Sequence, residues 1–169
     1  DVAALERAQT PTDRWYAESF DTWGNILDKT AQRFPDREAI VFGTERITYR
    51  ELQQRTNLFA RGLLRLGVKK GDHVALWMTN RPECAYVQFA IYKIGARMVP
   101  VNTRFKGAEA EYLLKQSDSV ALVMMDRFLG KIDAAAMLYE LCPELANALP
   151  GELQSERLPR LRTVIVLGD

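Results

Sequence analysis

The six residues from Val120 to Met125 are all apolar, with no polar side chain between them. A strand that alternates polar and apolar residues can face water on one side, whereas an unbroken apolar strand needs cover on both faces. Parallel sheets with helices on both sides provide that cover. This run therefore predicts a buried parallel sheet at the centre of the fold.

Strand-like and helix-like segments alternate along the chain around this run. Further apolar stretches predict strands at residues 73–78, 98–101 and 163–167. The intervening segments predict helices at residues 83–94, 109–117 and 132–141. Such alternation is typical of an α/β fold, so we expect a three-layer sandwich with a largely parallel sheet and right-handed connections.

A small β-hairpin is predicted ahead of this alternating region. Residues 39–42 and 46–49 are strand-like and flank a short Gly-Thr turn. Thr48 and Glu51 have the spacing of a capping box, in which each side chain accepts a hydrogen bond from the other residue's backbone N–H. We therefore expect a helix to start at this point and to end at Gly67.

The chain is expected to form one α/β subdomain over residues 20–169, preceded by a polar lead-in at 1–19. The first helix of the subdomain is predicted from Phe20 to Phe34, because apolar residues recur there at helical spacing until Pro35. Three aromatic residues near this start, Trp15, Tyr16 and Trp23, are expected to pack into the core, with a surface for a partner as the alternative.

Composition excludes several classes of protein. Lys and Arg number 23 against 22 Asp and Glu, a net charge of +1 that gives no field for binding nucleic acid. Cys84 and Cys142 have no metal-ligand or redox spacing, so we expect a reduced, cytoplasmic setting and no metal site. No apolar run approaches the roughly 18 residues of a membrane span.

No single motif in the sequence identifies a catalytic site or a nucleotide-binding site. Gly62 and Gly67 have the outer spacing of a phosphate loop, but Val68 stands where such a loop needs Lys. His73, the single histidine, has no Ser or Cys nucleophile near it in sequence and is expected to be structural. We therefore assign no catalytic residue.

Five segments together resemble the start of adenylate-forming enzymes. They occur in the family's order and spacing, and they are FPDREAI (34–40), ITYREL (47–52), GDHVAL (71–76), NRPE (80–83) and KIGARMVPVN (93–102). Residues 102–105 and 109–117 continue the likeness, and residues 137–145 look like the branches that act on fatty acids. The chain thus resembles the N-terminal segment of an AMP-forming acyl-CoA synthetase, and a fatty-acid-CoA ligase is favoured.

This resemblance implies a full-length enzyme that uses ATP, Mg²⁺ and CoA. Such enzymes convert a carboxylic acid to an acyl-AMP with release of pyrophosphate, and then transfer the acyl group to CoA. In this family, four functional groups come later in the sequence than the position that corresponds to residue 169. They are the phosphate loop, the magnesium ligand, the ribose-binding Asp and the C-terminal lysine. We therefore expect this polypeptide alone to bind no cofactor, to hydrolyse no ATP and to form no acyl-CoA.

The resemblance also gives candidates for lining the tunnel by which CoA approaches. The loop after the second core motif supplies Asn102, Thr103 and Arg104. Arg127 follows the Val120 strand, where its guanidinium is suited to a CoA phosphate.

Two other functions stay open at this stage. The chain fits a stand-alone, non-catalytic α/β binding module, which the reading frame beyond Asp169 would distinguish from an enzyme. It also fits another adenylate-forming protein, such as a peptide-synthetase adenylation domain or a luciferase-like oxidase. An open sheet edge would also allow a homodimer.

Overall fold

The computed structural model describes residues 22–128 and 132–168. Its centre is a four-stranded parallel sheet with the strand order β4-β3-β5-β8. The strands are β3 (His73–Trp77), β4 (Arg97–Pro100), β5 (Ala121–Met125) and β8 (Thr163–Leu167). The predicted parallel sheet is therefore confirmed, and the all-apolar strand β5 lies inside it, with every residue buried.

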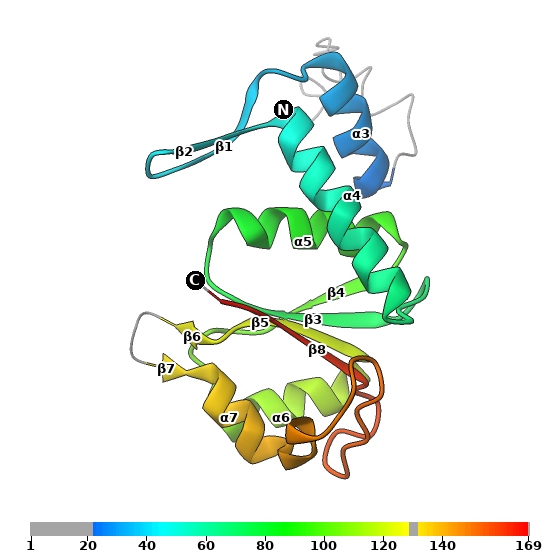
Figure 1. Cartoon of the computed structure of the whole chain (residues 1–169), viewed down its shortest axis with the longest axis vertical. Helices are drawn as coiled ribbons and strands as arrows, with labels where there is room; N and C mark the ends of the chain where they lie inside the picture. Colours follow the sequence, from blue (N-terminus) through cyan, green and yellow to red (C-terminus); the bar gives the residue numbers. More distant parts are fainter. Residues whose placement is uncertain (1–21, 129–131, 169) are drawn as a thin grey trace, which may run out of the picture.

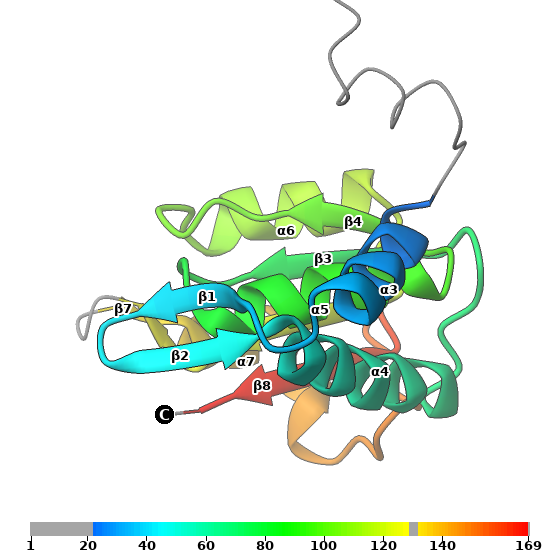
Figure 2. The same cartoon turned by 90° about the horizontal axis from the view of Figure 1, so that it is seen from above.

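Helices cover both faces of the sheet and complete the three predicted layers (Figure 1). One layer holds α3 (Trp23–Arg33), α4 (Tyr49–Arg65) and α5 (Pro82–Lys93), and the other holds α6 (Gly107–Gln116), α7 (Ala134–Leu141) and the 3₁₀ turn η1 (Pro143–Ala146). Seen from above, β4 and β8 lie at opposite borders of the sheet (Figure 2). The buried side chains of the sheet and both layers form one large core.

The predicted hairpin is present as β1 (Glu38–Phe42) and β2 (Glu45–Thr48), paired antiparallel. Gly43 in its turn has φ +58°, a left-handed conformation that glycine adopts without a Cβ clash. The hairpin extends to one side of the first helical layer (Figure 1). Together with α3, α4 and α5 it encloses a second, smaller core around Leu27, Ile47 and Leu52.

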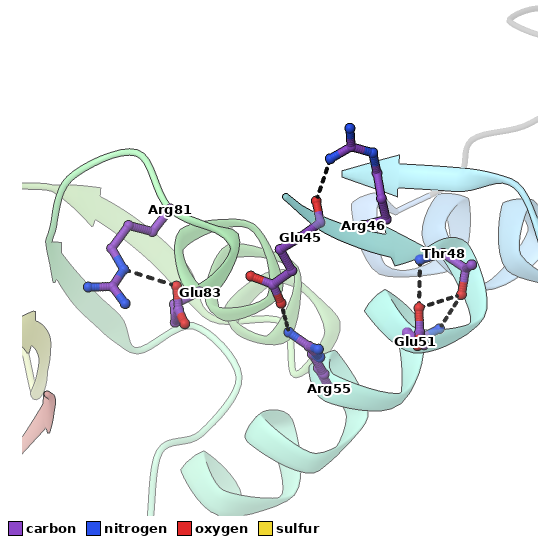
Figure 3. A network of polar contacts seen from close by, with 7 residues as sticks. All are labelled: Glu45, Arg46, Thr48, Glu51, Arg55, Arg81 and Glu83. Carbon is purple, nitrogen blue, oxygen red and sulfur yellow. Dashed lines mark hydrogen bonds and ion pairs between the residues drawn. The ribbon is translucent and has the colours of Figure 1, made fainter. Parts of the chain in front are cut away.

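Local sequence signals set the ends of α4. The backbone N–H of Thr48 donates to Glu51 Oε2 at 2.8 Å, and the N–H of Glu51 donates to Thr48 Oγ1 at 3.3 Å, which confirms the capping box (Figure 3). These two bonds satisfy backbone donors that a helix start otherwise leaves unpaired. Gly67 follows the last turn with φ +82° and ends the helix as expected.

Three predictions about the elements need correction. The segment predicted as one helix over 132–141 begins with the two-residue strand β7 (Ile132–Asp133), which pairs with β6 (Arg127–Phe128) before α7 starts. The helix predicted from residue 109 begins at Gly107, since the Glu109 carboxylate accepts a hydrogen bond from the N–H of Lys106. Trp23 is exposed on α3, so its predicted core position is wrong.

The lead-in at 1–19, with Trp15 and Tyr16, lies outside the described residues, as does the predicted start of the first helix at Phe20. Within the described ranges, no helix is long and apolar enough to cross a bilayer.

Candidate functional site

The carboxyl edge of the sheet is the place where this topology gathers candidate residues. The chain leaves β3 toward β4 on one side and leaves β5 toward β8 on the other, so the boundary between β3 and β5 is a topological switch point. In open α/β sheets, ligands bind outside the carboxyl ends of the strands at such a point. Three segments meet this edge: the loops at residues 78–81 and 101–106, and Asp126 with the start of β6.

The loop after β3 contacts the last residue of β5 at the switch point. The hydroxyl of Thr79 donates to the sulfur of Met125 at 3.4 Å, which joins the ends of the two strands. Arg81 Nε donates to Glu83 Oε2 at 3.2 Å, and both side chains are partly buried (Figure 3). From the sequence, residues 79–82 are predicted only as a turn. Their place after a central strand was the signal that could have added Thr79 and Arg81 to the candidates.

Asn102 holds the loop after β4 in place. Its carbonyl accepts a hydrogen bond from Trp77 Nε1 at 3.2 Å, and its side-chain Oδ1 accepts one from the backbone N–H of Arg104 at 2.9 Å. The side chain of Asn102 is therefore engaged in shaping its own loop, as in an Asx turn. Arg104 is exposed and Thr103 is half-buried.

Arg127 lies on β6, directly after β5, and is exposed. Its Nη2 donates to Asp133 Oδ2 at 3.4 Å across the β6–β7 ribbon, while Asp133 Oδ1 accepts from the N–H of Ala136 and caps α7. An exposed ion pair of this kind is worth less than about 1 kcal/mol, so an incoming phosphate could replace the carboxylate as the partner of Arg127.

The four predicted residues share one edge but do not form one cluster. Asn102, Thr103 and Arg104 follow β4, Arg127 follows β5, and β3 lies between these two strands. Neighbouring strands are about 4.8 Å apart, so the two groups are separated by roughly 10 Å at the strand ends.

The described residues carry little chemistry of their own. Burial raises the pKa of the Cys84 thiol and of the Cys142 thiol, which makes both poor nucleophiles at neutral pH. His73 Nδ1 lies 2.6 Å from the carbonyl oxygen of Ser117, a position that ties the strand start to the end of α6.

The donor set does not fit the magnesium and triphosphate that the resemblance implies. Over residues 22–128 and 132–168, no three His, Cys, Asp or Glu side chains are grouped so that they could hold a metal ion. A triphosphate needs concentrated positive charge or a cradle of backbone N–H groups. Of the arginines at the carboxyl edge, Arg81 and Arg127 are instead engaged with Glu83 and Asp133, and Arg104 is exposed on the loop after β4.

Comparison with known proteins identifies the family. A family model described as AMP-binding enzyme matches residues 27–167. The chain is 45% identical over 150 residues to the protein named "Putative acyl-CoA synthetase YngI" of Bacillus subtilis, covering 88% of this chain and 27% of that protein. It is 40% identical over 166 residues to the mitochondrial medium-chain acyl-CoA ligase ACSF2 of Mus musculus, covering 97% of this chain and 26% of that protein.

A solved structure agrees in shape with the described fold. The inhibitor-bound N-terminal domain of FACL13 from Mycobacterium tuberculosis matches with a TM-score of 0.73 and 25% identity, over 88% of this chain and 34% of that one. The chain spans about a quarter of the length of the curated relatives named above. Because the family model covers most of the chain, from the first helix to the last strand, the chain belongs to the AMP-binding enzyme family.

Proposed function

We propose that this chain is the N-terminal part of an AMP-forming acyl-CoA synthetase, and that it supplies scaffold and not catalytic groups. The observation that carries the proposal is the match to the AMP-binding family over residues 27–167. The names of the two curated relatives, an acyl-CoA synthetase and an acyl-CoA ligase, support the choice of reaction. The complete enzyme would use ATP, Mg²⁺ and CoA.

Fatty acids are the proposed carboxylic acid substrates. The mouse relative is named as a medium-chain acyl-CoA ligase, so medium-chain acids are the first to test. The proposed location is the cytoplasm, although that same relative is named as mitochondrial, which makes fractionation of the source cells the relevant measurement. Homodimer formation also stays a prediction, and sedimentation of the purified protein would test it.

The experiment compares the 169-residue chain with the product of the whole reading frame that contains it. Each is assayed for pyrophosphate release and for acyl-CoA with acids of increasing chain length, ATP, Mg²⁺ and CoA. We expect activity from the longer product and none from the chain alone. Pyrophosphate release without acyl-CoA would indicate another adenylate-forming reaction, and a stop codon after Asp169 would favour the binding module.

Calorimetry tests the scaffold role directly on the 169-residue chain. Titrations with ATP, with CoA and with an acyl-AMP should each give no binding heat at micromolar protein, because the chain is proposed to supply scaffold only. Over the described residues, no group of His, Cys, Asp or Glu side chains could hold the magnesium ion that accompanies ATP. Tight binding of ATP would contradict the proposal.

Arg127 is the candidate of choice for a contact with a CoA phosphate. Removing one charge-assisted hydrogen bond costs about 1.5–3 kcal/mol, so Arg127→Ala in the active longer enzyme should raise the KM for CoA about tenfold or more. The KM for ATP and kcat should change less than about twofold. Arg160→Ala, which removes an exposed arginine from the loop before β8, is the matched control and should change none of these.

A further inference from the structure

One buried side chain, Trp77, lies between the two groups of candidate residues at the carboxyl edge. One group follows β4 and the other follows β5, and Trp77 is the last residue of β3, the strand between them. In the sheet register Trp77 lies beside Met124 of β5, and Leu76 lies beside Pro100 of β4. The side chain of Trp77 is fully buried. It is therefore placed to contact both groups from the core.

On the β4 side, Trp77 holds the turn formed by residues 102–105. The carbonyl oxygen of Asn102 accepts two hydrogen bonds, from the indole N–H of Trp77 at 3.2 Å and from the N–H of Phe105 at 3.0 Å. A carbonyl oxygen has two lone pairs, so both are in use. The bond from Phe105 closes the turn on itself, and the bond from Trp77 ties the turn to the core.

On the β5 side, the same indole packs against the β6–β7 ribbon, which lies on the α7 side of the sheet (Figure 1). Its ring centroid is 5.4 Å from that of Phe128, with 49° between the planes, a favourable separation and tilt for two aromatic rings. Phe128 is fully buried and pairs with Ile132 of β7. Because Phe128 directly follows Arg127, a shift of its ring also moves the backbone that carries the guanidinium.

The two contacts share one rigid, planar side chain. The hydrogen bond to Asn102 fixes one edge of the indole, and the contact with Phe128 fixes the orientation of its rings. Protein interiors are close-packed, so the indole cannot turn without moving the groups around it. A change on the ribbon should therefore be felt in the turn, although β3 separates the two.

We infer that Trp77 is a positioning residue, which holds the 102–105 turn and the β6–β7 ribbon at a fixed spacing and thereby sets the affinity for CoA. Since it is fully buried, it acts through Asn102 and Arg127 and not by touching the ligand. The inference rests on the proposed function for the identity of the ligand. The coupling between turn and ribbon involves described residues alone, so it can be tested without that function.

The first experiment measures this coupling in the 169-residue chain. Phe128→Leu keeps an apolar side chain in the ribbon but removes the ring that packs on Trp77. Amide hydrogen exchange at residues 102–105 should become about tenfold faster, although the substitution lies on the far side of β3.

Leu52→Ala is the control for a general loss of stability. Leu52 is buried in the smaller core around Leu27 and Ile47, away from the carboxyl edge. Its truncation should lower the unfolding temperature at least as much as Phe128→Leu does, but should leave exchange at residues 102–105 within about twofold.

The second experiment measures the effect on CoA in the active longer enzyme. Trp77→Phe and Phe128→Leu should each raise the KM for CoA about fivefold, through weaker positioning of the turn and the ribbon. The rate of acyl-AMP formation, a step that does not use CoA, should change less than about twofold. Leu52→Ala should leave the KM for CoA within about twofold.

The double variant decides whether the two residues act together. If they act through their mutual contact, Trp77→Phe combined with Phe128→Leu should raise the KM for CoA no more than about twofold beyond Trp77→Phe alone. Independent effects would multiply to about 25-fold and would overturn the inference.

Unchanged exchange at residues 102–105 in Phe128→Leu would overturn the inference, and so would an unchanged KM for CoA in Trp77→Phe. A longer protein that forms no acyl-CoA would refute the proposed function, and with it the assignment of CoA as the ligand. Exchange in the 169-residue chain would still decide whether Trp77 couples the turn to the ribbon. The failure of the proposed function and the failure of the inference are thus separate results.

Discussion

β5 and β8 are neighbouring strands with nearly the same kind of sequence, yet their surroundings differ. Every residue of β5 is buried, whereas in β8 only Thr163 is buried and Val166 is 47% exposed. β5 pairs with β3 on one side and β8 on the other, while β8 pairs with β5 alone among the described strands. An apolar run therefore indicates that a strand needs other elements packed on both of its faces. It does not indicate that the same chain provides those elements.

The largest effect on stability is expected from placing a carboxylate in β5, compared with the same change in β8. Leu122→Asp buries a charge where no partner is available, which costs more than about 4 kcal/mol and should abolish the cooperative thermal transition of the 169-residue chain. Val166→Asp reaches solvent and should cost less than about 1 kcal/mol. Circular dichroism during heating measures both.

Loss of the transition in both variants would contradict the comparison, because it would mean that β8 is as enclosed as β5.

The same substitution at two tryptophans extends the contrast to aromatic side chains. Trp77 is fully buried, and its indole N–H donates to the carbonyl of Asn102. Its ring packs against Phe128 in a tilted arrangement, with centroids 5.4 Å apart and 49° between the planes. Trp77→Phe should cost about 2 kcal/mol through lost volume and a lost hydrogen bond. Trp23→Phe changes an exposed ring and should cost less than about 0.5 kcal/mol. Urea unfolding curves give both values.

The tryptophan experiment also probes the candidate site. Because Trp77 holds the carbonyl of Asn102, its replacement should loosen the loop after β4. Faster amide exchange at residues 102–105 in Trp77→Phe, but not in Trp23→Phe, is the expected result. Unchanged exchange would mean that the loop is held by its internal bonds from Arg104 and Phe105 alone.

A smaller effect on stability is expected at the capping box, which lies at the surface and acts only within the first turn of α4. Thr48→Ala removes the side-chain acceptor for the N–H of Glu51 and should cost about 1 kcal/mol. Thr44→Ala, four residues earlier in the exposed hairpin turn, is the control and should stay within about 0.5 kcal/mol. If both variants have the same unfolding midpoint in urea, the cap contributes nothing.

The elements that the sequence predicted correctly are those defined by local signals. The apolar run of β5, the proline after α3, the capping box of α4 and the glycine after it each act over a few residues, so they can be identified without knowing the fold. The β6–β7 ribbon was missed because strands of two residues have no detectable period. Trp23 was misplaced because its exposure depends on how α3 packs against the rest of the chain.

The candidate site was predictable in position but not in contacts. The ends of β4 and β5 could be identified from the sequence, so Asn102 and Arg127 were expected after strand ends, and both lie at the carboxyl edge of the sheet. Their partners could not, because the bonds to Trp77 and Asp133 depend on how distant segments and a short ribbon meet in space. Whether either residue contacts CoA stays a prediction for the longer enzyme.

The smallest expected effect on stability comes from removing the charge of Glu51. Hydrogen bonds from the backbone and side chain of Thr48 hold the pKa of Glu51 below its usual range. A carboxyl whose pKa is lowered by folding stabilises the fold above its unfolded pKa of about 4.3, and this contribution is lost as the pH falls toward the folded pKa. Wild type should therefore be more stable than Glu51→Gln at pH 7, and the difference should shrink below about pH 4. Glu140→Gln, which removes an exposed carboxylate from α7, is the control. Unfolding temperatures between pH 3 and pH 7 that run parallel for wild type and Glu51→Gln would show that the ionised carboxylate is not what caps α4.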